Sequence, residues 1–177
     1  MSTTQFAPGR FTLDPTRSFV RFRHKANWGF ATVQGGFGSV SGDGEVTADG
    51  SGHGTITVDA ASLDTKNPKR DTHLRSKAFF DVEEFPEITF DATLIKPTGA
   101  GIQVEGELTV RGTSRKLSFP GTYETEGTDA VVLRCTAEIQ RTDFGMTWNK
   151  LGMIKGSAAV ELELRFTTVV RQPEIVI

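Results

Sequence analysis

Apolar and polar residues alternate with a period of two along most of this chain of 177 residues. A β-strand points successive side chains to opposite faces, so the period predicts strands with one buried and one solvated face. In residues 18–26, Val20 and Phe22 fall on one face, and Arg21 and Arg23 fall on the other. Eight strands are predicted in this way, the other seven at residues 35–46, 53–60, 87–95, 102–110, 117–123, 131–139 and 160–166.

Short clusters of turn-forming residues separate these strands, at residues 49–52, 97–101, 111–114 and 126–129. Links of this length join antiparallel neighbours. Five glycines between residues 35 and 44 fall inside one predicted strand and indicate a bulge or a bent corner. A sheet with one apolar face removes both of its exposed edges by closing on itself. The chain is therefore predicted to be all-β, a single extended eight-stranded antiparallel β-barrel.

Two segments interrupt the alternation. In residues 64–86, Pro68 is followed by Asp71, which is suited to cap one short helix around residues 71–78. In residues 141–155, Phe144, Met146, Trp148, Leu151 and Met153 lie on what is predicted to be a loop, and they need a surface against which to pack.

Composition excludes several classes of protein. The length fits one domain, and a formal net charge of −2 with scattered basic residues excludes a nucleic-acid partner. Cys135 is the only cysteine, so no internal disulfide is expected. The first residues lack the apolar run of a signal peptide, and no integral membrane segment is predicted. A cytoplasmic protein is expected, or a periplasmic or secreted one if a signal peptide has been removed.

The residue pattern gives little support to catalysis. His24, His53 and His73 lie in separate segments without a second ligand at metal-binding spacing, so no metal site is predicted. The Gly-x-Ser-x-Gly pattern of a nucleophile elbow is absent. Cys135 lies in an apolar strand register, where burial should raise the pKa of its thiol. We expect no enzymatic activity and no cofactor.

The order and spacing of five motifs resemble the YceI-like family of lipid-binding proteins, from Phe11 to Arg165. The motifs read LDPTRSFVRFRHK, VQGGFGSVSGDGEV, SLDTKNPKRDTHLRSKAFFDVEEFPEITF, GELTVRGTSRKLSF and RTDFG. The resemblance implies a lipocalin-like barrel whose elongated interior holds a polyisoprenoid or another long-chain amphiphile. It is also compatible with a homodimer. The family pattern more often has Leu-Gly after His24, where this chain has Lys25 and Ala26, so a differently shaped mouth is expected near Trp28.

Residues in the apolar register of the predicted strands are candidates for contact with a ligand. An eight-stranded barrel is just wide enough either to be filled by its own side chains or to hold one small guest, and the sequence leaves both open. The candidates are Val20, Phe22, Phe37, Ile56, Val58, Ile88, Phe90, Val104, Leu108, Phe119 and Ile139.

The apolar loop supplies four more candidates: Phe144, Met146, Trp148 and Met153. Methionine adapts to irregular guests, so the loop is interpreted either as a lid over the cavity or as a plug in the barrel end. Both interpretations place these residues at the end of the interior.

Arg70, His73 and Arg75 are candidates for binding an anionic head group at the mouth, together with Trp28. The alternative is that Asp71 caps the helix, that both arginines pair with carboxylates such as Asp81 and Glu83, and that His73 is exposed.

These patterns predict a flexible N-terminal segment at residues 1–10, a barrel domain at 11–171 and a C-terminal tail at 172–177. The predicted function is binding of an elongated apolar or amphiphilic ligand in the barrel, for storage or transport. A polyisoprenoid, an isoprenoid quinone or a long-chain lipid would fit this description. The alternative function is an interaction module with a filled core and no small-molecule ligand.

Overall fold

The computed structural model describes residues 7–169, and of Lys155 the backbone only. The predicted tail at 172–177 and the first part of the predicted N-terminal segment lie outside the described residues, and the first strand begins at Gly9. The strands are β1 (Gly9–Leu13), β2 (Phe19–Ala26), β3 (Ala31–Phe37), β4 (Val40–Val46), β5 (Gly52–Asp59), β6 (Leu63–Asp64), β7 (Glu87–Thr98), β8 (Gly101–Val110), β9 (Thr113–Glu126), β10 (Ala130–Ile139) and β11 (Lys155–Thr168). One α-helix, α1 (Pro68–Arg75), lies beside them.

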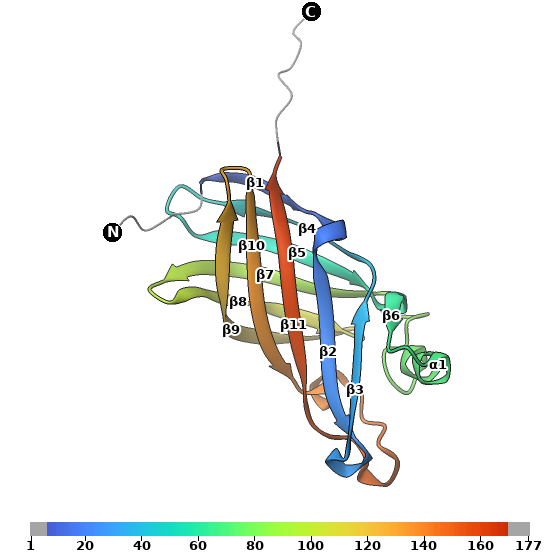
Figure 1. Ribbon diagram of the computed structural model, residues 1–177. Helices are drawn as coiled ribbons and strands as arrows, with labels where there is room; N and C mark the ends of the chain where they lie inside the picture. Colours follow the sequence, from blue (N-terminus) through green and yellow to red (C-terminus); the bar gives the residue numbers. More distant parts are fainter. Residues whose placement is uncertain (1–6, 170–177) are drawn as a thin grey trace, which may run out of the picture.

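Eight strands close into an antiparallel barrel, as predicted (Figure 1). Their order is β1-β4-β5-β7-β8-β9-β10-β11, and pairing of β1 with β11 completes the circle. Strands β2, β3 and β6 continue the sheet from the other half of β11. We call the end where β1 meets β4 and β11 the seam end. The loop end is the opposite one, formed by the β2–β3 turn, residues 66–86 and residues 141–154.

The strand predicted at residues 35–46 is wrong in one respect, because it is parts of two strands. β3 ends at Phe37 and β4 begins at Val40. Between them, the backbone N–H of Gly38 donates to the carbonyl of Ser62 at 3.1 Å, and that of Ser39 donates to Ser62 Oγ at 3.1 Å. These bonds take the chain out of the ladder, so the glycine-rich segment makes the bent corner that its composition indicates.

The helix begins three residues earlier than predicted and ends at Arg75. Asn67, not Asp71, is the N-cap, because its side-chain oxygen accepts a hydrogen bond from the backbone N–H of Arg70. Pro68 follows at the first helical position, where its fixed φ and missing N–H are tolerated. The buried carboxylate of Asp71 instead accepts two hydrogen bonds from Thr65, which tie the helix to the segment before it.

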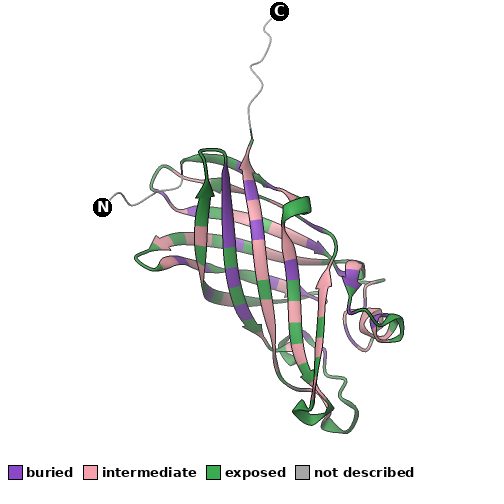
Figure 2. Ribbon diagram, viewed as in Figure 1, coloured by how far each residue is buried: buried purple, intermediate pink, exposed green. Residues whose placement is uncertain are grey.

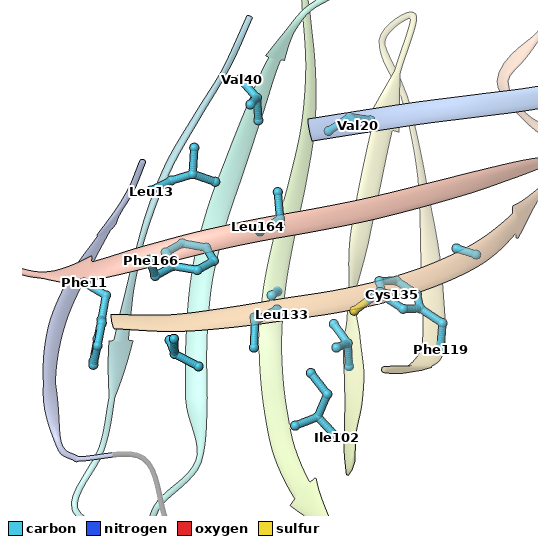
Figure 3. Packing of buried hydrophobic residues seen from close by; sticks show 14 of the residues in the cluster. Phe11, Leu13, Val20, Val40, Ile102, Phe119, Leu133, Cys135, Leu164 and Phe166 are labelled. Atoms are coloured by element: carbon cyan, nitrogen blue, oxygen red, sulfur yellow. The ribbon is translucent and has the colours of Figure 1, made fainter. Parts of the chain in front are cut away.

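Burial follows the alternation of the sequence, with buried and exposed bands along the barrel strands (Figure 2). At the seam end, Phe11, Leu13, Leu164 and Phe166 pack with neighbouring strands into the largest apolar cluster (Figure 3). At the loop end, Phe79 and Phe144 belong to a second, smaller cluster, whose other buried members are Leu108, Val110 and Met146. In the part of the chain described here, no helix combines the length and the apolar character needed to cross a bilayer.

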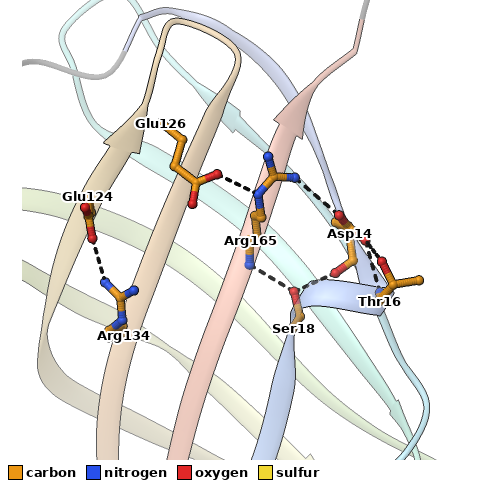
Figure 4. Close-up of polar contacts among 7 residues, drawn as sticks. All are labelled: Asp14, Thr16, Ser18, Glu124, Glu126, Arg134 and Arg165. Carbon is orange, nitrogen blue, oxygen red and sulfur yellow. Dashed lines mark hydrogen bonds and ion pairs between the residues drawn. The ribbon is translucent and has the colours of Figure 1, made fainter.

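Polar contacts hold the outside of the seam end (Figure 4). The guanidinium of Arg165 donates to Glu126 at 2.8 Å and to Asp14 at 3.2 Å, and its backbone N–H donates to Ser18 Oγ at 2.9 Å. The hydroxyl of Thr16 donates to Asp14 and, as the largest cause, holds the pKa of that carboxyl below its ordinary value. These contacts join the corner between β1 and β2 to β9 and β11.

Candidate ligand cavity

The barrel encloses a cavity of about 730 Å³ that runs from Phe11 and Phe166 at the seam end to Trp148 and Leu151 at the loop end. Apolar side chains from all eight barrel strands and from β2 and β3 line it. The interior is therefore not filled by the protein's own side chains. All eleven residues predicted from the strand register, and all four predicted from the loop, lie in its wall.

Paired aromatic rings shape the middle of the cavity. The centroids of Phe22 and Phe37 are 5.6 Å apart, and those of Phe90 and Phe119 are 5.5 Å apart, both in tilted arrangements. Cys135 lies in the same wall, where burial raises the pKa of its thiol to about 11, as its register predicted. At neutral pH this thiol is an uncharged, apolar part of the lining.

A row of small residues crosses four barrel strands. Gly44 pairs with Gly54, Gly54 pairs with Ala92, and Ala92 pairs with Gly106. A Cβ atom on Gly54 would lie 2.4 Å from the carbonyl oxygen of Asp43, so a side chain has no room there. Register shifts in the β5–β7 and β7–β8 pairs lie beside the row. Glycines and bulges together let the wall bend sharply, and Gly44 and Gly54 line the cavity with bare backbone.

The apolar loop acts partly as a plug and partly as a rim. Phe144 is only 2% exposed and Met146 is buried, so the first half of the loop packs into the barrel end. Trp148 is exposed and Met153 half-buried, although both line the cavity. Arg111 fixes the plug, because its guanidinium donates to the carbonyls of Gly145 at 2.7 Å and Lys77 at 2.8 Å.

Three aromatic rings meet where α1 approaches the loop. The His73 ring lies edge-on to Trp148 with centroids 4.5 Å apart, and edge-on to Phe79 at 5.1 Å. Phe79 and Trp148 are 5.5 Å apart. The alternative in which His73 is simply exposed is wrong, because this half-buried ring lines the cavity.

Cationic side chains line the cavity near this aromatic cluster. Arg70 lies one turn before His73 on α1, and its guanidinium donates to Thr65 Oγ1 at 2.8 Å and to the Thr65 carbonyl at 2.9 Å. Arg141 donates to the carbonyls of Met146 and Trp148, and burial lowers the pKa of its guanidinium. Neither arginine makes an ion pair among the residues described.

Two predicted head-group residues lie elsewhere. Arg75 does not line the cavity, since its guanidinium donates to the carbonyls of Ala61 and Leu63. Pairing of Arg70 and Arg75 with Asp81 and Glu83 is also wrong, because backbone carbonyls and a hydroxyl take those donors instead. Trp28 lies outside the wall, on the β2–β3 turn.

Several residues that line the cavity are not among the candidates predicted from the sequence. Phe11 belongs to a strand that was not predicted, and Phe79 and Phe80 belong to an irregular segment without periodicity. Others were in the recognised alternation of the last two strands and could have been found from it: Val131, Leu133, Val160, Leu162, Leu164 and Phe166. In residues 7–169, no group of three or more His, Cys, Asp or Glu side chains is arranged to hold a metal ion.

The chain is thus of the class of closed eight-stranded β-barrels whose apolar interior leaves room for a small guest. The family model of the YceI-like domain matches residues 11–168, and the chain belongs to this family. A UPF0312 protein of Yersinia pestis (strain Pestoides F) is 30% identical over 156 residues, covering 83% of this chain and 77% of the relative. A UPF0312 protein of Yersinia enterocolitica has the same identity and coverage.

Solved structures share the fold at lower identity. BcnA of Burkholderia cenocepacia superposes with a TM-score of 0.78 at 21% identity, covering 86% of this chain and 98% of that one. A polyisoprenoid binding domain from Saccharophagus degradans, implicated in plant cell wall breakdown, gives 0.71 at 15% identity, covering 90% and 98%. The YCEI protein of Campylobacter jejuni gives 0.70 at 20% identity, covering 80% and 88%.

Proposed function

We propose that the protein holds one elongated apolar or amphiphilic lipid in its barrel, for storage or transport. A polyisoprenoid, an isoprenoid quinone or another long-chain lipid fits this description. The observation that carries the proposal is the continuous apolar cavity of about 730 Å³ between the two barrel ends. Sites for small molecules span about 300–1,000 Å³, so the space suits one guest.

Hydrophobic contact along the guest would supply most of the affinity. Burial of one CH₂ group contributes about 0.8 kcal/mol, which corresponds to about a fourfold change in affinity for each methylene. The affinity should therefore rise with chain length until the guest fills the cavity, and further carbons should add little. Selectivity in this proposal follows length and girth.

A polar or anionic head group would lie at the loop end. Arg70, His73 and Arg141 line that end, and the middle of the cavity is apolar. Arginine binds carboxylate or phosphate through two parallel hydrogen bonds. Both guanidinium groups already donate to carbonyls that hold them in place, which leaves their other N–H groups for a ligand.

The family supports a binding role over catalysis. One structural neighbour is described as a polyisoprenoid binding domain, and the present barrel has the same fold. The alternative of an interaction module with a filled core is less well supported, because the barrel interior contains a large cavity.

The direct test is denaturing extraction of the purified full-length protein, followed by mass spectrometry of the extract. The expected result is one long-chain lipid per barrel, or uptake of an added polyisoprenoid alcohol by protein that was purified empty. Repeated recovery of protein without lipid, together with failure to take up the added alcohol, would overturn the proposal.

A further inference from the structure

Among residues 7–169, four of the five exposed large apolar side chains gather at one end of the molecule. Among residues 7–169, the large apolar side chains with the greatest exposure include Phe30 at 93% and Leu151 at 76%. Trp28 and Trp148 are also exposed. Trp28 and Phe30 lie on the β2–β3 turn, and Leu151 lies on the turn at Lys150–Gly152, two residues after Trp148. These turns form the lower tip of the molecule in Figure 1 and are largely exposed in Figure 2. We call these four residues the apolar tip.

Hydrogen bonds join the two turns into one surface. The backbone N–H of Trp28 donates to the carbonyl of Met153 at 3.0 Å, and its indole N–H donates to the carbonyl of Leu151 at 3.1 Å. A ring nitrogen of His24 lies 3.1 Å from the carbonyl oxygen of Gly156. The tip is thus a fixed, convex feature rather than two independent loops.

The sequence segments that contain the two turns carry basic residues only. Residues 22–42 and 144–154, which contain both turns, include Arg23, Lys25 and Lys150 but no Asp or Glu. Lys25 and Lys150 are exposed. The whole chain carries a formal net charge of −2, so these two segments are basic against the balance of the chain.

We propose that the apolar tip docks the protein onto the surface of an anionic lipid bilayer. Tryptophan and phenylalanine favour the boundary between head groups and acyl chains, and each nearby lysine or arginine adds attraction to anionic lipid. Four side chains are enough to insert into the soft head-group layer of a bilayer. A stable protein–protein interface instead needs about 800 Å² of complementary surface on each partner, so the small tip favours the bilayer.

Docking would place the cavity against the membrane. Trp148 and Leu151 belong both to the tip and to the cavity wall, so a bound tip would bring that end of the cavity to the lipid head groups. This role for the surface rests on the proposed lipid-binding function. The membrane affinity of the tip does not require a ligand in the barrel.

The test is cosedimentation of the full chain with vesicles of phosphatidylcholine alone or mixed with phosphatidylglycerol. We expect stronger binding to the mixed vesicles and a blue shift of tryptophan emission. The double variant Phe30→Ser, Leu151→Ser should lower partitioning at least tenfold, because it removes the most exposed apolar groups. Val169→Ser removes an exposed apolar residue just after β11, at the seam end, and should change nothing.

Charge is tested separately. Lys25→Glu should lower binding to the mixed vesicles about fivefold or more, since each basic residue contributes about 1 kcal/mol near an anionic surface. Lys96→Glu, on β7 away from the tip, is the matched control and should bind as the wild type does.

Three results would overturn the proposal: no binding by the wild type, equal binding by the double variant, or a dimer that requires the tip while vesicles stay unbound. Lipid in the barrel is measured on the same samples by mass spectrometry. Vesicle binding by a barrel that never holds lipid would contradict the proposed function and leave the tip standing. A lipid-loaded protein that ignores vesicles would contradict the tip alone.

Discussion

The seam end and the loop end of the barrel differ in how the barrel is closed and in how far their apolar side chains are exposed. At the seam end, β1 pairs on both sides, the buried rings of Phe11 and Phe166 line the end of the cavity, and Arg165 joins β9, β11 and the corner before β2. At the loop end, irregular segments replace strand pairing, and large apolar groups face solvent. One end is therefore closed by regular strand pairing, and the other is closed by irregular segments that line the cavity.

Backbone conformation shows the same contrast. Trp28 and Leu151, both at the loop end, have φ values of 56° and 54°, in the left-handed region that bulky side chains disfavour. Such residues each cost about 1–2 kcal/mol. The seam end has glycine at its left-handed positions in the β9–β10 and β4–β5 turns, Gly127 and Gly50. In residues 7–169, left-handed backbone at bulky apolar residues is found at the end where function is proposed.

The largest expected effect lies at the seam end. Phe166→Ala removes a buried ring that packs in the main cluster and should lower the free energy of unfolding by about 3 kcal/mol. Urea denaturation followed by circular dichroism measures it. Leu151→Ala at the loop end is the matched control and should cost less than about 0.5 kcal/mol. Equal losses at both ends would contradict this contrast between the ends.

The labelling rate of Cys135 reports how well the cavity wall is closed in the folded protein. Because burial raises the pKa of Cys135 to about 11, from 9.0, its thiolate fraction at pH 8 should fall about a hundredfold. Labelling by a small thiol reagent should be slower than in urea by at least this factor and should speed up as the pH rises towards 11. Bound lipid should slow it further. Rapid labelling of the native protein at pH 8 would mean that the wall opens readily.

A larger ring in the middle of the cavity tests empty space. Phe90→Trp should reduce lipid capacity several-fold while changing the free energy of unfolding by less than about 1 kcal/mol, because the added bulk enters the cavity. A filled core would instead lose about 1–3 kcal/mol to overpacking. Lipid uptake and urea denaturation on the same preparation distinguish the two, with Phe90→Leu as the control that enlarges the cavity.

The smallest effect concerns strain at the loop end. Leu151→Gly should leave the protein unchanged or stabilise it by about 0.5–1 kcal/mol, since glycine adopts the left-handed region without penalty and little buried area is lost. Thermal unfolding measures the shift. The reference variant is Leu151→Ala, which keeps the strain and should not stabilise. Clear destabilisation by glycine would show that this side chain contributes packing despite its exposure.

Much of the barrel could be predicted from periodicity, and the exceptions have physical causes. Strands such as β2 and β8 can be detected in the sequence because one face of each is apolar. β1 is only five residues long and includes one glycine, so its alternation is too short to detect. The predicted helix starts three residues too late because Asp71 resembles an N-cap in the sequence. In the structure its carboxylate accepts a hydrogen bond from Thr65, a tertiary contact that no local pattern encodes.

The site was predictable where it depends on strand register and unpredictable where it depends on loops. Phe22 and Phe90 line the cavity because alternate residues of a strand must face inward. Arg70 lines it and Arg75 does not, a difference set by which carbonyls the two guanidinium groups reach. The position of Trp28 depends on its bonds to a turn more than a hundred residues away.

The row from Gly44 to Gly106 has a consequence for how this chain tolerates sequence change. Val46 on β4 and Ile56 on β5, two of the four strands that the row crosses, face the interior and should accept other apolar residues of similar size. Gly54 and Gly106 should accept none, because an added methyl group would meet a neighbouring backbone oxygen at 2.4 Å and 2.3 Å. In a saturation library selected for folded protein, the least replaceable positions of this wall would be ones that contribute no side chain to it.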